Sequence, residues 1–297
     1  AGLRAAVSAG ADAVYFGRGG TSNARARATG FDPAGLERAL RYLHAHGRRG
    51  HVTMNTLVFD EEIPALERAL RTVAEAGADA ILVQDLGVLR LARELAPTLP
   101  IHASTQMTCT DVGSVRFAAS LGAERVVLAR ELSLDEIRSI TLAVPEVEIE
   151  VFVHGALCVA YSGQCLTSEA IGGRSANRGA CAQACRLPYE LVVDGALRDL
   201  GDRAYLLSPE DLEGSALVPE LAAAGVRSLK IEGRLKSPEY VAATTRLYRA
   251  AVDALDGNAA PPGRAEVDRA LQTFSLGSGP GFLRGVDHQR IVDAHGC

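Results

Sequence analysis

Four segments of this sequence share one pattern, in which a glycine ends a helix, one or two residues follow, and an apolar strand begins. The segments are SAGADAVYFG, EAGADAILVQ, SLGAERVVLA and AAGVRSLKIE. Glycine is favoured at the end of a helix because it adopts left-handed backbone angles without a steric penalty. Short helix-to-strand links of this kind, leading into strands as apolar as AILV, are typical of parallel sheets covered on both faces. The sequence therefore predicts an α/β fold.

The order of strands and helices favours a TIM-like (β/α) barrel. Strands are predicted at 12–17, 51–57, 80–85, 101–105, 125–129, 148–155, 205–208 and 228–233. Amphipathic helices lie between most of them, and the helix at 32–47 has Asp32 as its N-cap and Pro33 in its first turn. Residues 1–9 read as a helix, so we expect the first strand of the barrel to be missing from this chain. The run at 205–208 is surplus and is expected outside the barrel.

The domain prediction follows from these elements. Residues 1–256 are expected to form the barrel, with an insertion at about 156–204 that carries four of the six cysteines. The stretch GNAAPPG reads as a linker because glycine and proline interrupt regular structure. Residues 257–297 are therefore expected to be this linker and the start of a C-terminal segment.

Charge and hydropathy exclude some classes of protein. The net charge is −5, so nothing about the whole chain attracts nucleic acid. Arginines do cluster at 17–30, 46–51 and 172–179, which allows a local basic face. No apolar run reaches the roughly 18 residues of a membrane span, and no signal-peptide pattern is present. We expect a cytoplasmic protein with no membrane partner.

Polar residues stand at the ends of the predicted strands. They are Asn55, Gln84, Asp85, His102, Ser104, Thr105, Gln106, Arg130, Glu131, His154, Glu232 and Arg234. The carboxyl ends of barrel strands meet at one face, where barrel enzymes place their active sites. We predict a polar pocket there, with Asn55, His102 and Gln106 as candidate substrate-binding residues.

Two positions in this set have competing interpretations. His154 ends an apolar strand four residues before Cys158, so it is either a rim histidine bonded to backbone or an acid–base group. Lys230 lies inside an apolar strand and needs a partner. Glu232 shares its face by the period of two, which predicts a structural ion pair or, with Arg234, an anion-binding set. We expect His154, Lys230, Glu232 and Arg234 around one pocket, as candidate catalytic residues.

The cysteines Cys158, Cys165, Cys181 and Cys185 are separated by gaps of six, fifteen and three residues. Disulfides are disfavoured in a reducing cytosol. Structural zinc sites usually contain paired cysteines with short gaps, which only CAQAC approaches. An iron–sulfur cluster accepts wider spacing, and the glycines nearby let backbone amides approach sulfur. Spacing favours a cluster over zinc and leaves both open.

A longer motif surrounds these cysteines. An acidic residue, Phe, Gly, Ala and Cys are followed by Gly-x-Cys and Ser, at Glu150, Phe152, Gly155, Ala156, Cys158, Gly163, Cys165 and Ser168. With NARARATGF, HASTQ, VVLARELS and AGVRSLKIEGR, this sequence resembles peptidase family U32, the collagenase-like peptidases, over about residues 1–255. Within the family, the stretch from 152 to 189 is most similar to the branch that hydroxylates cytidine in 23S rRNA. The tRNA uridine hydroxylase branch is similar but usually has Trp where this chain has Leu187.

The resemblance implies an oxygen-independent hydroxylation of an RNA base. It implies a 4Fe–4S cluster on Cys158, Cys165, Cys181 and Cys185, with prephenate as the hydroxyl source. RNA would be the partner, bound through a local basic face that includes Arg174 and Arg178. The branch that hydroxylates ubiquinone precursors is disfavoured, because it takes its fourth cysteine from further downstream.

A peptidase and a barrel with a purely structural metal remain as alternatives. The sequence contains neither H-E-x-x-H nor G-x-S-x-G, and four cysteines that bind a cluster cannot act as free nucleophiles. Cys109 is the spare thiol near the predicted rim. The peptidase interpretation therefore depends on the family name more than on a recognisable mechanism.

Overall fold

The computed structural model describes residues 1–19, 30–257, 259–274, 277–285, 291–292 and 294–295. Most of the predicted arginine cluster at 17–30 lies outside these residues, as does nearly all of the NARARATGF motif. Parts of the predicted C-terminal segment at 257–297 also fall outside them.

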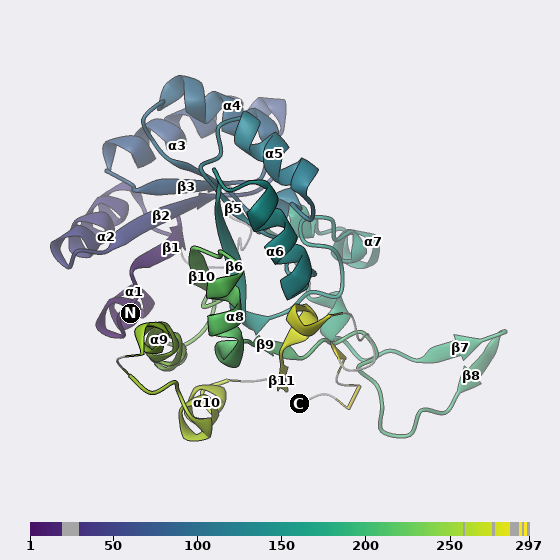
Figure 1. The fold of residues 1–297 in the computed structure, drawn as a ribbon. Helices are drawn as coiled ribbons and strands as arrows, with labels where there is room; N and C mark the ends of the chain where they lie inside the picture. Colours follow the sequence, from purple (N-terminus) through teal and green to yellow (C-terminus); the bar gives the residue numbers. More distant parts are fainter. Residues whose placement is uncertain (20–29, 258, 275–276, 286–290, 293, 296–297) are drawn as a thin grey trace.

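In the described part of the chain the main sheet has nine strands, and seven of them form a continuous parallel run (Figure 1). They are β1 (Ala13–Gly17), β2 (Arg49–Met54), β3 (Ala80–Val83), β4 (Ile101–Ala103), β5 (Arg125–Val127), β6 (Glu148–Ala156) and β10 (Ser228–Ile231). Each pairs with the next along the chain, and β10 pairs with β6. This sequential parallel order confirms the predicted α/β class.

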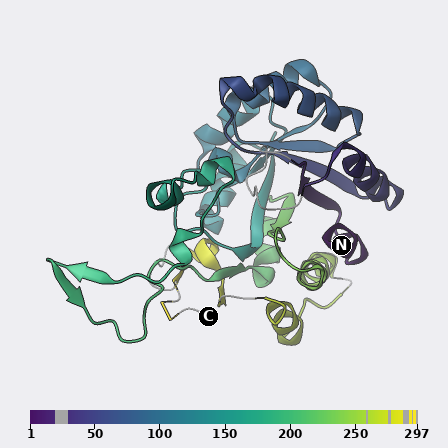
Figure 2. The same cartoon turned by 180° about the vertical axis from the view of Figure 1, so that it is seen from behind.

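Helices cover the outside of this sheet (Figures 1 and 2). They are α1 (Gly2–Ser8), α2 (Pro33–Ala45), α3 (Ile63–Glu75), α4 (Leu86–Leu95), α5 (Val112–Ser120), α6 (Leu134–Ala143), α8 (Val218–Ala223), α9 (Pro238–Asp253) and α10 (Arg264–Leu271). The Asp32 carboxylate accepts a hydrogen bond from the Gly35 amide at 2.6 Å, so the predicted N-cap of α2 is confirmed. The four glycines of the repeated pattern all have positive φ, between 79° and 102°. Their helices therefore end where the sequence predicted.

The sheet curves so that its first and last parallel strands approach each other. The Tyr15 hydroxyl on β1 donates to the Ile231 carbonyl on β10 at 3.2 Å, and α1 packs against α9. Within the described residues, no ladder of hydrogen bonds joins β1 to β10. The barrel-like curvature brings the carboxyl ends of all seven strands to one face.

The connection from β6 onward departs from the simple repeat. The run at 205–208, predicted to be a strand, forms a turn and an irregular segment. The strand comes slightly later, as β9 (Asp211–Glu213), and lies antiparallel to the end of β6. Because the chain has just left β6 and returns beside it, this pairing anchors both ends of the insertion.

The insertion holds the short helix α7 (Thr167–Gly172) and the hairpin of β7 (Leu191–Val193) and β8 (Ala196–Arg198). The hairpin projects away from the body of the molecule in both views (Figures 1 and 2). Beyond residue 257, α10 packs on α9, and β11 (Ser278–Gly279) pairs with β9. Among the described residues, no helix combines the length and the apolar character that crossing a membrane requires.

Candidate functional site

One cavity lies between the strand ends and the insertion, with a volume of about 120 Å³. Its walls come from both parts of the chain. They include Tyr15, Asn55, Ser104, Thr105, Gln106, Arg130, Phe152, Lys230, Glu232 and Arg234 from the barrel, and Cys158, Tyr161, Ser162, Gly163, Cys165, Asn177, Cys181 and Cys185 from the insertion. The cavity is therefore at the face where the sequence predicted a polar pocket.

All four clustered cysteines line this cavity as free thiols. Burial raises the pKa of the Cys185 thiol, and the neighbouring Cys158, Cys181 and Cys165 raise it further, against the opposing effect of Arg186. The Gln183 amide points at Cys181 Sγ from 3.4 Å. Thiolates repel one another when no cation lies between them, so each disfavours the charged form of its neighbours. Cysteines that bind a metal behave in this way when the metal is absent.

The arrangement can be compared with the two metal centres that the spacing left open. A tetrahedral zinc ion lies about 2.3 Å from each sulfur and so draws four thiolates tightly together. Among the described residues, no three His, Cys, Asp or Glu side chains are gathered to hold a single ion. In a four-iron cluster each cysteine binds a different iron, so the thiolates stand further apart around a common space. All four thiols line one cavity, so the cluster and the single ion both remain predictions for this site.

The loop from 157 to 166 carries two of these thiols and is fixed to the barrel. Gly163 has φ +79°, and a Cβ atom on it would lie 1.9 Å from the Gln106 carbonyl oxygen. Next to it, the Ser162 amide and hydroxyl donate to the Glu131 carboxylate at 3.0 and 2.9 Å. The Thr108 hydroxyl donates to the Ser162 carbonyl at 2.6 Å. Only glycine fits at position 163, so the loop presses directly on the barrel rim.

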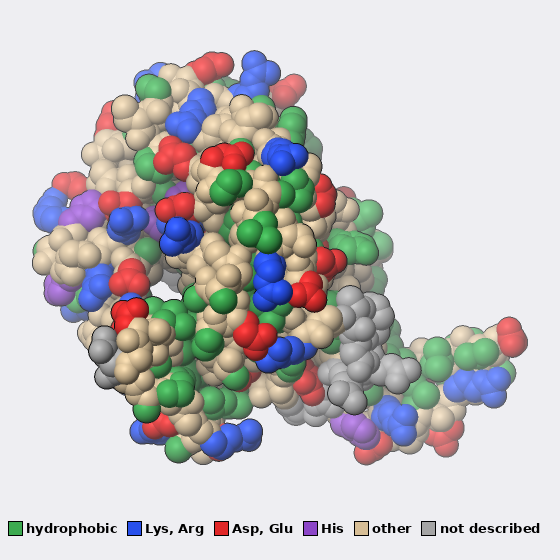
Figure 3. Space-filling model, viewed as in Figure 1, with side chains coloured by type: hydrophobic (Ala, Val, Ile, Leu, Met, Phe, Trp, Pro, Cys, Tyr) green, Lys and Arg blue, Asp and Glu red, His purple; other side chains and the backbone are tan. Residues whose placement is uncertain are grey.

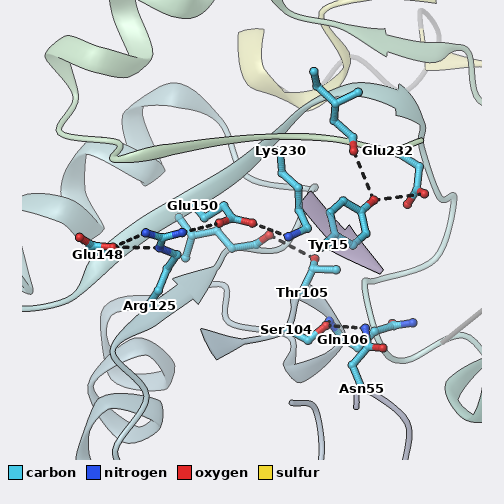
Figure 4. Close-up of polar contacts among 12 residues, drawn as sticks. Tyr15, Asn55, Ser104, Thr105, Gln106, Arg125, Glu148, Glu150, Lys230 and Glu232 are labelled. Atoms are coloured by element: carbon cyan, nitrogen blue, oxygen red, sulfur yellow. Dashed lines mark hydrogen bonds and ion pairs between the residues drawn. The ribbon is translucent and has the colours of Figure 1, made fainter. Parts of the chain in front are cut away.

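A chain of charged side chains lies inside the barrel (Figure 4), and Lys230 at one end of it lines the cavity. Lys230 Nζ lies 2.5 Å from Glu150, and both side chains are buried. Arg125 Nη1 contacts the other oxygen of Glu150 at 3.2 Å and also pairs with the exposed Glu148. Of the two interpretations of Lys230, the ion pair with Glu232 is wrong, because its partner is Glu150. Glu150 faces Lys230 because β6 and β10 are adjacent strands in parallel register.

Glu232 instead belongs to the wall of the cavity. Its carboxylate lies 3.2 Å from Arg130 Nη2 and accepts a hydrogen bond from Tyr15 at 3.4 Å. The Arg130 guanidinium lies 3.7 Å from the centre of the Phe152 ring, and that of Arg234 lies 5.0 Å from the Tyr15 ring. Burial raises the pKa of Tyr15, and Glu232 raises it further. Arg130 and Arg234 thus place positive charge at the cavity wall, and each guanidinium lies over an aromatic ring.

His154 does not line the cavity, unlike the prediction. Lys230 pairs with Phe152, but the next residue, Ile231, pairs with His154, so β6 contains one extra residue at this point. This irregularity turns the imidazole away from the barrel interior, towards α9, where its Nδ1 lies 3.3 Å from the Tyr248 hydroxyl. Burial lowers the pKa of His154 to about 4, so the ring is neutral at physiological pH.

Two of the three residues at strand ends that were predicted to bind substrate line the cavity, and the third does not. Asn55 and Gln106 line the cavity, and the Asn55 amide donates to the Ser104 hydroxyl at 3.0 Å. His102 lies two residues before Ser104, inside the barrel, with its ring 4.9 Å from that of His51. Burial lowers the pKa of His102 to about 3. The cavity wall therefore contains Asn55 and Gln106 but not His102.

The two arginines predicted to contact RNA differ from each other. Arg174 is exposed, at the end of α7. Arg178 makes two hydrogen bonds to Glu62, at 2.7 and 3.0 Å, and lies 4.2 Å from the Phe59 ring. Its guanidinium therefore ties the insertion to the barrel. On the face shown in Figure 3, acidic and basic side chains are interspersed, with no continuous basic patch among the described residues.

Sequence reasoning missed Glu150 as the partner of Lys230, and Tyr15 and Tyr161 as site residues. Glu150 could have been found, because a glutamate inside an apolar strand needs a cation as much as a buried lysine needs an anion. Tyr15 lies on the first strand, whose face towards the barrel could not be chosen from its pattern alone. The place of Tyr161 depends on how the insertion folds over the rim, which local sequence does not indicate.

This chain is similar to known proteins over nearly its whole length. The model of peptidase family U32 matches residues 1–293. A 23S rRNA 5-hydroxycytidine synthase of Escherichia coli is 42% identical over 282 residues, which are 95% of this chain and 42% of that protein. The tRNA hydroxylation protein P of Escherichia coli is 35% identical and covers 96% of this chain and 73% of that protein.

A protein named collagenase from Porphyromonas gingivalis is 38% identical over 264 residues, which are 85% of this chain and 63% of that protein. This chain thus spans less than half the length of the rRNA-modifying relative. The match to the family model, the identity of 35% or more to these three relatives and the cysteines around one cavity agree. The chain belongs to peptidase family U32.

Proposed function

We propose that this chain is the barrel part of an iron–sulfur-dependent, oxygen-independent RNA base hydroxylase of the cytoplasm. The substrate proposed is a cytidine of 23S rRNA. The observation that carries the proposal is the single cavity that four thiols share with polar and cationic barrel residues. The relatives named for rRNA and tRNA hydroxylation, at 42% and 35% identity, support RNA as the substrate class. A tRNA uridine is the alternative target.

In this proposal Cys158, Cys165, Cys181 and Cys185 hold a 4Fe–4S cluster. The cluster would supply one-electron redox chemistry at the mouth of the barrel. The barrel residues would bind and orient the reactants. Because the thiols come from an insertion whose loop is fixed against Gln106 through Gly163, the cluster and the barrel wall would keep a constant separation.

The hydroxyl source is proposed to be prephenate, which carries two carboxylates. Arg130, Lys230 and Arg234 line the cavity and carry positive charge. Arginine binds carboxylates through paired hydrogen bonds. Glu232, between Arg130 and Tyr15, would keep these cations in place when the anion is absent. The candidate catalytic residues in the cavity are thus Lys230, Glu232 and Arg234, with His154 in a supporting position behind the wall.

A peptidase mechanism has weaker support from the site. Among the described residues, Cys109 is the thiol that the cluster would leave for nucleophilic attack, and it is buried next to Ser114. Burial and the nearby Asp111 raise the pKa of this thiol to about 12, so the reactive thiolate is scarce at neutral pH. Because one relative is named a collagenase, proteolysis is the alternative activity that the experiments must distinguish from RNA hydroxylation.

The cofactor is tested on anaerobically purified protein. We expect the brown colour of an iron–sulfur cluster with about four irons per chain, lost in Cys181→Ala and kept in Cys109→Ser. Colourless protein with one zinc ion would contradict the cluster.

The activity is tested by mass spectrometry of rRNA and tRNA from a deletion strain. We expect one hydroxylated nucleotide to disappear and to return with the wild-type gene but not with Cys181→Ala. Unchanged RNA, together with cleavage of gelatin by the pure protein, would support the peptidase instead.

RNA binding can be separated from stability with the two arginines of the insertion. Arg174→Glu is expected to weaken RNA binding and to make the remaining binding less dependent on salt, because one cation fewer contacts phosphate. The free energy of unfolding should stay unchanged, because this side chain is exposed. Arg178→Glu is expected to lower stability as well, because it places a second carboxylate against Glu62. Equal effects of the two changes on unfolding would contradict this assignment.

A further inference from the structure

An aromatic side chain stands exposed at the mouth of the cavity. Tyr161 lines the cavity, yet 67% of its surface is accessible to solvent. Within the described part of the chain, its hydroxyl has no hydrogen-bond partner. An accessible aromatic ring beside a site offers a face on which a flat partner, such as a base, can stack.

The backbone that carries Tyr161 is held firmly although its ring is free. The next residue, Ser162, is buried and is bound through its amide, hydroxyl and carbonyl to Glu131 and Thr108. Gly163 follows and touches the Gln106 backbone. A ring mounted on fixed backbone loses little conformational entropy when a partner stacks on it. The Tyr161 ring can therefore stack on a partner at a small cost in conformational entropy.

The surroundings indicate which kind of partner this ring contacts. Amide side chains of Asn55, Gln106 and Asn177 line the same cavity. Amides both donate and accept hydrogen bonds, which suits the edge of a nucleobase. Proteins that recognise RNA mostly bind unpaired bases by stacking them on aromatic rings and bonding their edges. Tyr161 at the mouth of the cavity provides a ring for stacking, and the three amide side chains inside provide hydrogen bonds to the edge of a base.

We propose that Tyr161 is the stacking platform for an unpaired base of the RNA substrate at the entrance of the cavity. The inference rests on the proposed RNA-modifying function and adds a requirement for single-stranded RNA. Tyr161 acts here as a binding and positioning residue, because it presents the nucleotide to the cavity. A base paired in a duplex has no free face at this position and would be excluded.

The chain contains no tryptophan, so Tyr161→Trp introduces a single fluorescent reporter at the mouth. Stacking of a base on the indole is expected to quench its emission when a short single-stranded oligoribonucleotide of mixed sequence is added. The same strand annealed to its complement is expected to leave the emission unchanged. The control is Phe117→Trp, on α5, where the side chain is 54% exposed and does not line the cavity. We expect no quenching there.

Affinity gives an independent readout on the anaerobically purified protein, by fluorescence anisotropy with the same labelled strand. Stacking of one base accounts for about a 5- to 150-fold change in the dissociation constant. We therefore expect Tyr161→Ala to bind that much more weakly, and Tyr161→Phe to bind nearly as well as wild type. Phe117→Ala is expected to bind like wild type.

The outcomes separate this inference from the proposed function. If wild type binds single-stranded RNA and Tyr161→Ala binds it equally well, the stacking role is overturned while RNA modification stands. If wild type prefers the duplex, the stacking role is also overturned. If wild type binds neither form and the RNA of the deletion strain is unchanged, both the inference and the proposed function fail.

Discussion

Replacing Glu150 by glutamine removes the negative charge that compensates two cations inside the barrel. The side chains of Glu150 and Lys230 are only 4% and 7% exposed, and Arg125 lies 3.2 Å from the second carboxylate oxygen. Burial works to raise the pKa of Glu150, but Lys230 and Arg125 outweigh it and hold the pKa at about 2, below the usual 4.5. At about 1.4 kcal/mol per pH unit, this difference favours the charged form by about 3 kcal/mol.

A second estimate of the loss in the free energy of unfolding caused by Glu150→Gln is of the same size. Removing one member of a buried ion pair typically costs about 3–5 kcal/mol, because the other charge is left without compensation. We therefore expect Glu150→Gln to lower the free energy of unfolding by about 3 kcal/mol or more. Lys230→Met should cost less, because Arg125 still compensates Glu150. The double change should cost less than the sum of the two single changes, since it leaves no unpaired lysine.

The measurement is urea denaturation at neutral pH under anaerobic conditions, followed by far-ultraviolet circular dichroism. Glu148→Gln is the matched control, because it is the same substitution on the same strand and partners the same arginine, but its side chain is 55% exposed. We expect this control to cost no more than about 1 kcal/mol. Equal losses for Glu148→Gln and Glu150→Gln would refute the reasoning, and so would a larger loss for Lys230→Met than for Glu150→Gln.

Two further predictions concern the loop and the buried histidines. Gly163→Ala should reduce the iron content of anaerobically purified protein, because its Cβ would lie 1.9 Å from the Gln106 carbonyl oxygen and displace the loop between Cys158 and Cys165. The control is Gly173→Ala, where a Cβ meets nothing within 4 Å. Equal iron content in both variants would contradict the close contact at Gly163. Burial lowers the pKa of His51 and His154 to about 4 and that of His102 to about 3, from 6.5. Since the unfolded chain takes up these protons first, stability should be complete above pH 6.5 and fall as the pH is lowered towards 4. Denaturation across this range should show a shallower decline for His154→Phe than for wild type, and an unchanged slope would argue against a neutral buried imidazole.

The fold class could be predicted from the sequence because its signals are local. Each of the four glycines that end a helix is followed within two residues by an apolar run, and these features act within one helix–strand unit. The cysteine insertion was equally visible, because Cys158, Cys165, Cys181 and Cys185 follow one strand and precede the next. The exceptional lysine, Lys230, could be singled out because an ammonium inside an apolar strand needs a partner wherever that strand is placed.

The partners within the site could not be predicted in this way. Lys230 meets Glu150, 80 residues earlier, and Arg178 meets Glu62, 116 residues earlier. Such pairs depend on which strands are neighbours and in what register. The one extra residue in β6 turns His154 out of the cavity, and a period of two along the strand gives no sign of it. Local sequence thus determined the elements and the chemistry they carry, while the side chains that meet were decided by tertiary register, because a shift of one residue moves a side chain to the opposite face.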